Sequence, residues 1–188
     1  PLYIHAEDEE YLEAFTNRAQ TEYGDSIASF FESRPKIAET TAVRDVLDIV
    51  SITETKTVIA HTTTAESLRH ISEARKNDVP VFAEVTPYHL TFSRNMIENV
   101  GTDGIGTPPV RDDRNRQKLW SHLRDTDVQL IGSDHAPHQS HEKDRNPLDV
   151  APGMPQLETA LASLFDAASR DVVGVERIVE LYAEFPAR

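Results

Sequence analysis

Residues 57–75, TVIAHTTTAESLRHISEAR, contain the pattern that decides the fold. The apolar run Thr57–His61 (TVIAH) is short and continuous, which is typical of a strand covered on both faces. A threonine-rich cap follows it, and Ala65–Arg75 then places apolar residues at helical spacing on one face. The stretch therefore predicts a buried strand that leads directly into a helix.

The same unit recurs on either side of this stretch. Further strands are predicted at Leu2–His5 (LYIH), Val81–Val85 (VFAEV) and Val128–Ile131 (VQLI). Helical patterns occupy Glu9–Tyr23, Glu39–Val50, Asp113–Arg124, Leu157–Ala168 and Val175–Phe185. Four strands alternating with helices predict an α/β fold with a parallel sheet. Either an open doubly wound sheet or part of a (β/α)8 barrel fits, and no glycine-rich nucleotide-binding motif follows any strand.

Length and composition exclude several classes of protein. The chain has 188 residues, 38% of them hydrophobic, which is enough for one domain with a buried core. A net charge of -13 disfavours nucleic-acid partners, and the absence of cysteine excludes disulfides, thiolate zinc sites and cysteine nucleophiles. No apolar run approaches the roughly 18 residues of a membrane span. The absence of cysteine fits a cytoplasmic enzyme, and we expect no membrane partner.

Three polar residues occupy equivalent positions at strand ends. His5 ends the first predicted strand, His61 ends the second, and Asp134 follows the fourth. Because the carboxyl ends of parallel strands share one mouth, we expect these side chains to converge. Two imidazoles and a carboxylate are suitable ligands for zinc or a similar divalent ion.

The densest cluster of reactive side chains is Gly132–Lys143, GSDHAPHQSHEK, within a long irregular segment at His135–Pro155. These twelve residues contain an aspartate, three histidines, a glutamate and a lysine, directly after an apolar strand. Long loops in such a position are more often functional than not. The segment is the strongest candidate for a site.

GSDHAPHQSHEK resembles the signature of dihydroorotases: Gly or Ala, Ser or Thr, Asp, any residue, Ala-Pro-His, four residues, then Lys. Other stretches resemble class I dihydroorotases of the amidohydrolase superfamily in the same order along the chain. They are IHAED at 4–8, AHTTTAES at 60–67, AEVTPYHL at 83–90, TPPVRDDRNR at 107–116 and PGMPQLETAL at 152–161. The resemblance implies that residues 1–188 are the C-terminal half of a metal-dependent (β/α)8 TIM-type barrel, strands five to eight with their helices. The chain also starts in a strand without Met, as expected of a piece of a longer protein.

The resemblance also implies roles for individual residues. His5, His61 and Asp134 would bind one or two zinc ions, with the remaining ligands outside these residues, and Asp134 would also move the catalytic proton. His138, Thr107, Pro152 and Gly153 would bind the substrate. The implied reaction is the reversible hydrolysis of dihydroorotate to N-carbamoyl-L-aspartate in pyrimidine synthesis, by an enzyme that is a possible homodimer. The isolated half barrel is expected to be inactive.

Two differences from the dihydroorotase pattern leave the identity of the substrate undecided. Many relatives have Asn where this chain has Thr107, and His-His where it has Tyr88 and His89. An allantoinase or hydantoinase would use the same scaffold and ligands. A non-catalytic subunit that scaffolds a partner such as aspartate transcarbamoylase is a third possibility, which the retention of His5, His61 and Asp134 disfavours.

Overall fold

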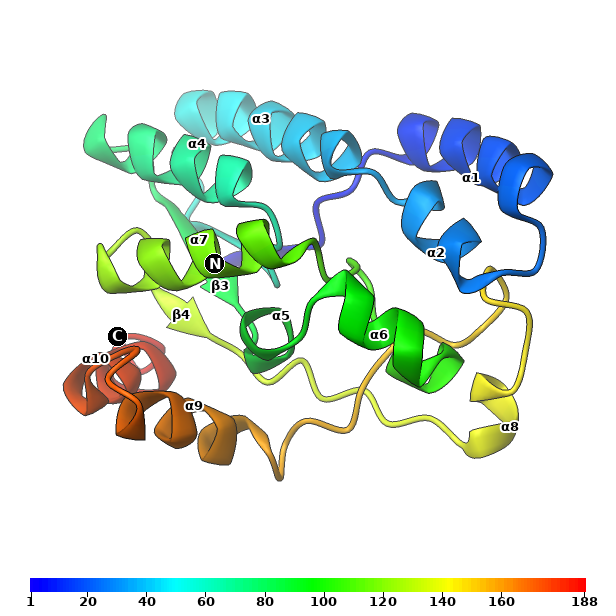
Figure 1. Ribbon diagram of the computed structural model, residues 1–188. Coiled ribbons are helices and arrows are strands. Elements are labelled where there is room, and N and C mark those ends of the chain that lie inside the picture. Colours follow the sequence, from blue (N-terminus) through cyan, green and yellow to red (C-terminus); the bar gives the residue numbers. More distant parts are fainter.

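Four parallel strands form one sheet in the order β1-β2-β3-β4 (Figure 1). The structure is a computed structural model that describes all 188 residues. The strands are β1 (Leu2–Ile4), β2 (Thr57–Ile59), β3 (Val81–Val85) and β4 (Leu130–Ile131). Each strand pairs with the next in sequence, as Ile4 with Ile59 and Val85 with Ile131. The predicted α/β fold with a parallel sheet is confirmed.

Helices connect the strands and cover the sheet. Helices α3 (Lys36–Thr53), α4 (Ala65–Lys76) and α7 (Asp113–Arg124) precede β2, β3 and β4, and lie one below another in Figure 1. After β4 come α8 (Ser140–Lys143), α9 (Ala160–Ser169), α10 (Val175–Val179) and the π-helical turn η2 (Glu180–Glu184). The remaining elements are α1 (Glu9–Tyr23) and α2 (Ile27–Ser33) after β1, and α5 (Pro87–Thr91), α6 (Arg94–Val100) and η1 (Thr102–Gly104) after β3. No helix is both long and apolar enough to cross a membrane.

The main core lies between the sheet and these helices. Its 20 buried residues include Val81, Ala83 and Val85 of β3, which are fully buried. Leu68 and Ile71 of α4, both predicted on the apolar face of that helix, also reach zero exposure. A second cluster of seven residues, including Phe30, packs under the loops at the carboxyl ends of the strands. The loops that carry the polar candidate residues therefore have their own apolar support.

Several predicted boundaries need correction. The strands are shorter than expected: β1 ends at Ile4, β2 at Ile59, and β4 begins only at Leu130. Helix α3 extends beyond Glu39–Val50 at both ends, and α9 begins at Ala160 rather than Leu157. The predicted helix at 175–185 is divided between α10 and the π-helical turn η2. Strand β2 ends early because His61 leaves the extended conformation, with a φ of +33°.

The sequence did not predict α2, α5 or α6. Each has five to seven residues, too few to show a helical repeat. Helix α5 depends on its start, where the Thr86 side chain accepts from the His89 N–H and Pro87 occupies the first turn. The irregular segment at 135–155 likewise contains α8 and a parallel β-bridge between His135 and Met154. These elements are held by caps and tertiary contacts rather than by periodicity.

Candidate functional site

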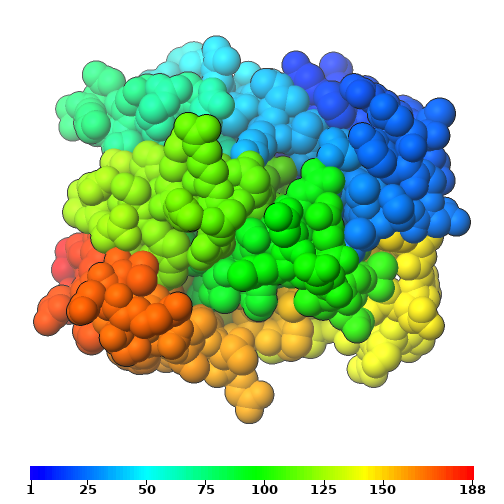
Figure 2. Space-filling view, in the orientation of Figure 1, coloured from blue at the N-terminus to red at the C-terminus, as the bar shows by residue number.

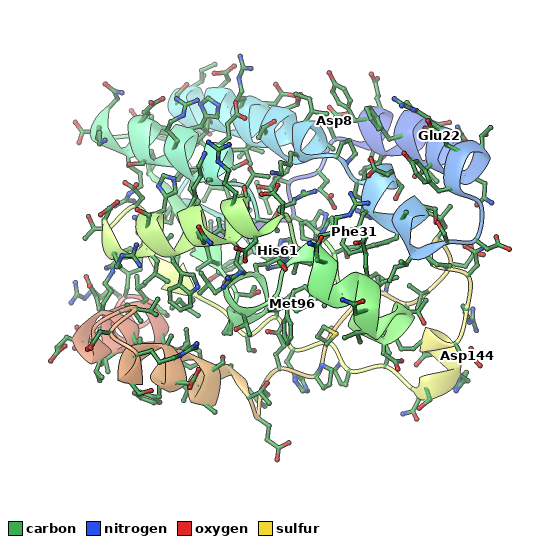
Figure 3. All side chains as sticks on the ribbon, viewed as in Figure 1. Asp8, Glu22, Phe31, His61, Met96 and Asp144 are labelled. Atoms are coloured by element: carbon green, nitrogen blue, oxygen red, sulfur yellow. The ribbon has the colours of Figure 1, made fainter.

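Two histidines meet where β1 and β2 end. His5 follows β1 directly and His61 lies two residues beyond β2, and the pairing of Ile4 with Ile59 makes both leave the sheet at one edge. His5 Nδ1 and His61 Nε2 are 3.2 Å apart. In Figure 3 His61 lies near the centre of the molecule, whereas Glu22 and Asp144 mark its periphery. The structure brings these two predicted ligands into contact.

The geometry of the pair fits a shared metal ion. Zn–N bonds are about 2.0–2.1 Å long, so two nitrogens 3.2 Å apart can both bind one ion. Burial lowers the pKa of His61, and the neighbouring His5 lowers it further, against the opposing charges of Asp134 and Glu39. A lowered pKa favours the neutral imidazole, which is the form that binds metals. The buried Nδ1 of His61 has no hydrogen-bond partner.

Asp134 reaches this region from β4 by a strained turn. Its φ is +48°, in the left-handed region that side-chain-bearing residues rarely adopt. Its negative charge acts on both His61 and Glu84. The structure contains no group of three or more histidine, aspartate and glutamate side chains arranged to hold a metal ion. The role of Asp134 as a third ligand therefore stays a prediction.

Glu7 fixes the orientation of the His5 ring. Its Oε2 lies 2.9 Å from His5 Nε2 and 2.5 Å from Arg34 Nη1. Burial acts to raise the pKa of Glu7, but the hydrogen bond with His5 and the charge of Arg34 outweigh it and hold the pKa below its usual value. With Nε2 engaged by a carboxylate, His5 presents Nδ1 to His61. Such carboxylate–imidazole pairs orient metal-binding histidines in many proteins.

Glu84 supports His61 from β3. The His61 backbone N–H donates to Glu84 Oε1 over 3.2 Å, while His61 itself has a φ of +33°. Burial raises the pKa of Glu84, and Asp134 adds to that shift. The carboxylate lies so close to β4 that a Cβ at Gly132 would approach Oε2 to 2.6 Å. The sequence analysis missed Glu84, although a carboxylate inside a buried strand was a visible signal.

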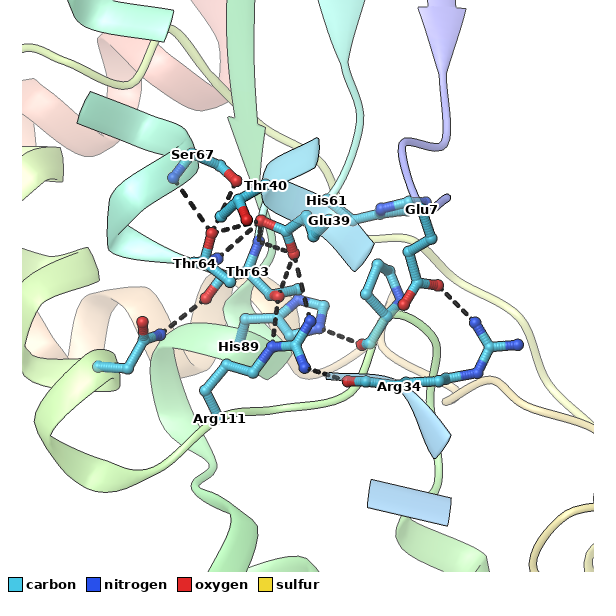
Figure 4. Close-up of polar contacts among 12 residues, drawn as sticks. Glu7, Arg34, Glu39, Thr40, His61, Thr63, Thr64, Ser67, His89 and Arg111 are labelled. Atoms are coloured by element: carbon cyan, nitrogen blue, oxygen red, sulfur yellow. Dashed lines mark hydrogen bonds and ion pairs between the residues drawn. The ribbon is translucent and has the colours of Figure 1, made fainter. Parts of the chain in front are cut away.

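A buried ionic network holds the chain that follows His61 (Figure 4). Glu39 of α3 accepts from the backbone N–H groups and hydroxyls of Thr63 and Thr64. Arg111 donates to Thr63 Oγ1 over 2.9 Å and to the carbonyl of Arg34 over 2.6 Å, and its Nη2 lies 3.5 Å from Glu39. These side chains come from distant parts of the chain, so the network ties the two histidine-bearing turns to one scaffold.

The residues predicted to bind substrate gather in neighbouring loops. His138 Nε2 lies 3.2 Å from the carbonyl oxygen of Pro152, and the Gly153 N–H donates to the carbonyl of Ile105 over 3.0 Å. Thr107 and Pro152 line a common cavity of about 150 Å³. The structure thus places His138, Thr107, Pro152 and Gly153 in one cluster, and their contact with substrate stays a prediction.

Tyr88, which departs from the dihydroorotase pattern, and its neighbour His89 both face the protein interior. The Tyr88 hydroxyl donates to the Gly104 carbonyl over 2.6 Å, and burial raises its pKa. His89 is buried, with Nε2 donating to the Pro108 carbonyl over 2.8 Å and Nδ1 2.8 Å from Thr86 Oγ1. Both belong to α5. They stabilise the loop rather than present free groups.

Comparison with known proteins gives consistent relatives. A dihydroorotase from Pyrococcus abyssi is 34% identical over 188 residues, covering all of this chain and 44% of that protein. A dihydroorotase from Halobacterium salinarum is 32% identical over 184 residues, or 98% of this chain and 41% of that protein. An allantoinase from Desulfitobacterium hafniense is 28% identical over 171 residues, or 91% of this chain and 38% of that protein. The chain spans less than half the length of these relatives.

The fold has similar neighbours among solved structures. An L-hydantoinase (dihydropyrimidinase) from Arthrobacter aurescens superposes with a TM-score of 0.94 at 25% identity, covering 98% of this chain and 42% of that one. A search of family models finds no match. The named relatives are two dihydroorotases and an allantoinase, and the L-hydantoinase structure shares the fold of this chain. Together these similarities support the placement of the chain in the amidohydrolase superfamily.

Proposed function

We propose that these residues are the C-terminal half, strands five to eight, of a (β/α)8 dihydroorotase, which hydrolyses dihydroorotate reversibly to N-carbamoyl-L-aspartate. The observation that carries the proposal is the pair of imidazole nitrogens 3.2 Å apart at the ends of adjacent parallel strands. The GSDHAPHQSHEK motif and the dihydroorotase relatives support this reaction over others. Cytoplasmic location and a homodimer are parts of the same proposal.

The metal that this function requires is zinc, one or two ions, with further ligands supplied outside residues 1–188. His5 and His61 fit such an ion by separation and protonation state, and Asp134 would join them. When bound, zinc lowers the pKa of a water molecule and polarises a carbonyl group. Glu7 orients the His5 ring for metal binding, and Glu84 accepts a hydrogen bond from the backbone N–H of His61.

Asp134 carries the proton in the proposed reaction. Its carboxylate accepts a proton from the water that attacks the ring carbonyl, and returns it to the amide nitrogen as the C–N bond breaks. The water oxygen stays on the new carboxyl group, whose remaining proton is released to the solvent at neutral pH, so atoms and charges balance. His138 and the backbone near Pro152 would orient the substrate, and Thr107 would contact it with a hydroxyl in place of an amide.

A hydantoinase or allantoinase is the second candidate. The TM-score of 0.94 with an L-hydantoinase and the relationship to an allantoinase favour it specifically. Both candidates use the same metal ligands and differ in the ring that is opened.

The test uses the whole protein that contains these residues, purified with zinc. Dihydroorotate, allantoin and hydantoin are assayed side by side with Asp134→Ala and with Asp144→Ala, an exposed carboxylate on the same loop. Turnover of dihydroorotate that is lost only in Asp134→Ala is the expected result. Turnover of another ring instead would establish the second candidate. No turnover despite bound zinc would refute both and leave a scaffold subunit.

A further inference from the structure

A cleft of about 550 Å³ lies between α7 and α9, on the outer surface of the helical layer. Leu90 and Thr91 of α5 and Met96 of α6 line its third side. Figure 2 shows this face, where the yellow-green, green and orange segments meet around a hollow. None of the residues that line the cleft belongs to the candidate site described above.

The charge of the cleft opposes that of the whole chain. Its lining contains Arg116, Arg124 and Arg170 but only one acidic residue, Asp166, whereas the chain carries a net charge of -13. Helix dipoles explain part of this arrangement, because Arg124 and Arg170 lie at the C-terminal ends of α7 and α9. They do not explain Arg116, which lies in the first turn of α7 where a positive charge is disfavoured.

The three arginines have hydrogen-bond donors to spare. A guanidinium carries five N–H donors. Arg124 makes a single hydrogen bond, to the Val172 carbonyl over 3.1 Å, and no ion pair. Arg170 bonds only to the carbonyl and carboxylate of Asp166. Arg116 uses Nε and Nη2 on Asp113 and Nη1 on the Leu90 carbonyl. The cleft therefore presents more donors than the protein's own acceptors satisfy.

The cleft also has an apolar wall. Leu90, Met96 and Val172 line it beside Trp120, whose indole N–H donates to the Leu90 carbonyl over 2.8 Å. That bond and the one from Arg116 share a single acceptor, so both side chains are held in place. A cleft of this volume, apolar on one side and donor-rich on the other, has the size of a small-molecule site.

We propose that this cleft binds a small organic molecule that carries a phosphate group. A phosphate presents three acceptor oxygens and up to two negative charges, which match several arginine donors at once. The apolar wall would contact the uncharged part of the ligand. The proposal does not depend on which ring the candidate active site opens, because the two sites share no residue.

The test measures binding of ribose 5-phosphate, inorganic phosphate and glutarate by titration calorimetry, at constant ionic strength, to the whole protein that carries these residues. We expect saturable binding of ribose 5-phosphate with a Kd below about 1 mM. Arg124→Gln and Arg170→Gln should each weaken it about tenfold, since a hydrogen bond to a charged group is lost. The matched control is Arg18→Gln on α1, an exposed arginine far from the cleft in sequence.

Fluorescence locates the bound ligand. Trp120 is the single tryptophan of the 188 residues and lines the cleft, so the ligand should change a signal that Trp120→Phe removes. Absence of saturable binding, or equal loss in the Arg18→Gln control, would overturn the proposal. Equal affinity for glutarate would overturn the preference for phosphate. Inorganic phosphate binding as tight as that of ribose 5-phosphate would show that the rest of the ligand contributes nothing and would contradict an organic ligand.

Discussion

Replacement of Glu39 by Gln should destabilise the protein strongly. Glu39 is 2% exposed and accepts hydrogen bonds from four donors, the N–H groups and hydroxyls of Thr63 and Thr64. Glutamine keeps the shape but turns one acceptor oxygen into a donor, which would face those N–H groups. It also removes the one carboxylate within ion-pair distance of Arg111.

The expected magnitude follows from breaking a buried ion pair. Removing one partner of such a pair costs about 3–5 kcal/mol, because the other charge stays buried without compensation. Arg111 is 7% exposed, and its buried Nη2 makes no hydrogen bond and has only the ion pair with Glu39. At an m-value of about 2 kcal/mol per molar urea, this loss lowers the unfolding midpoint by about 1.5–2.5 M.

Urea unfolding followed by circular dichroism and by tryptophan fluorescence measures this change. Coincidence of the two transitions establishes that one free energy describes them. The matched control is Glu66→Gln on α4, whose carboxylate is 62% exposed and should cost at most about 0.5 kcal/mol.

A double variant separates the ion pair from the hydrogen bonds to the threonines. Glu39→Met with Arg111→Met removes both charges, so the double change should cost at least about 1 kcal/mol less than the sum of the single changes. Additive costs would show that Glu39 and Arg111 do not interact. A loss below about 1 kcal/mol for Glu39→Gln would refute the network as a support of the loop after His61.

Three further changes test smaller parts of the structure. Gly153→Ala places a Cβ 2.6 Å from the Ala136 carbonyl oxygen at a φ of +154°, so amide exchange at Ala136 should accelerate; unchanged exchange would contradict this packing. Burial lowers the pKa of His89 to about 3, below its unfolded value of about 6.5, so its contribution to stability is complete above pH 6.5 and is lost as the pH falls toward 3. Urea unfolding between pH 7 and 4 should show a slope of up to about 1.4 kcal/mol per pH unit that His89→Gln reduces, and an equal slope in both proteins would contradict a neutral buried imidazole. Tyr88→Phe should cost about 1 kcal/mol in the same assay by leaving a buried carbonyl unpaired, with the ring preference unchanged; a changed preference would show that the hydroxyl reaches the substrate.

Local patterns were sufficient for the order of the main elements. The helices at 9–23 and 113–124 were predicted with the boundaries that the structure shows, because helical spacing of apolar residues is a local feature. The strand that ends at Ile59 was predicted two residues too long, since the polar turn that carries His61 looks extended in sequence. Short helices such as α5 escaped prediction because a single turn has no period.

The residues of the candidate site likewise include some that the sequence identifies and others that only the structure shows. His5, His61 and Asp134 could be selected from the sequence, because parallel strands bring their carboxyl ends together whatever the details of packing. The supporting carboxylates Glu7 and Glu39 were harder to identify from the sequence. Their partners, Arg34 and Arg111, are distant along the chain and come into contact with them only after folding. The sequence also contained no indication that the Tyr88 hydroxyl would turn inward to a backbone carbonyl.

The sequence alone determined the parallel α/β architecture and the residues that lie at the rim of the sheet, because both follow from the spacing of apolar side chains along short segments. Only the tertiary structure decided that His5 and His61 approach within 3.2 Å, that Glu7 and Glu84 hold them, and that three arginines converge on one outer cleft. Distances between residues far apart in the chain depend on how whole elements pack, and that packing depends on volume and burial throughout the core.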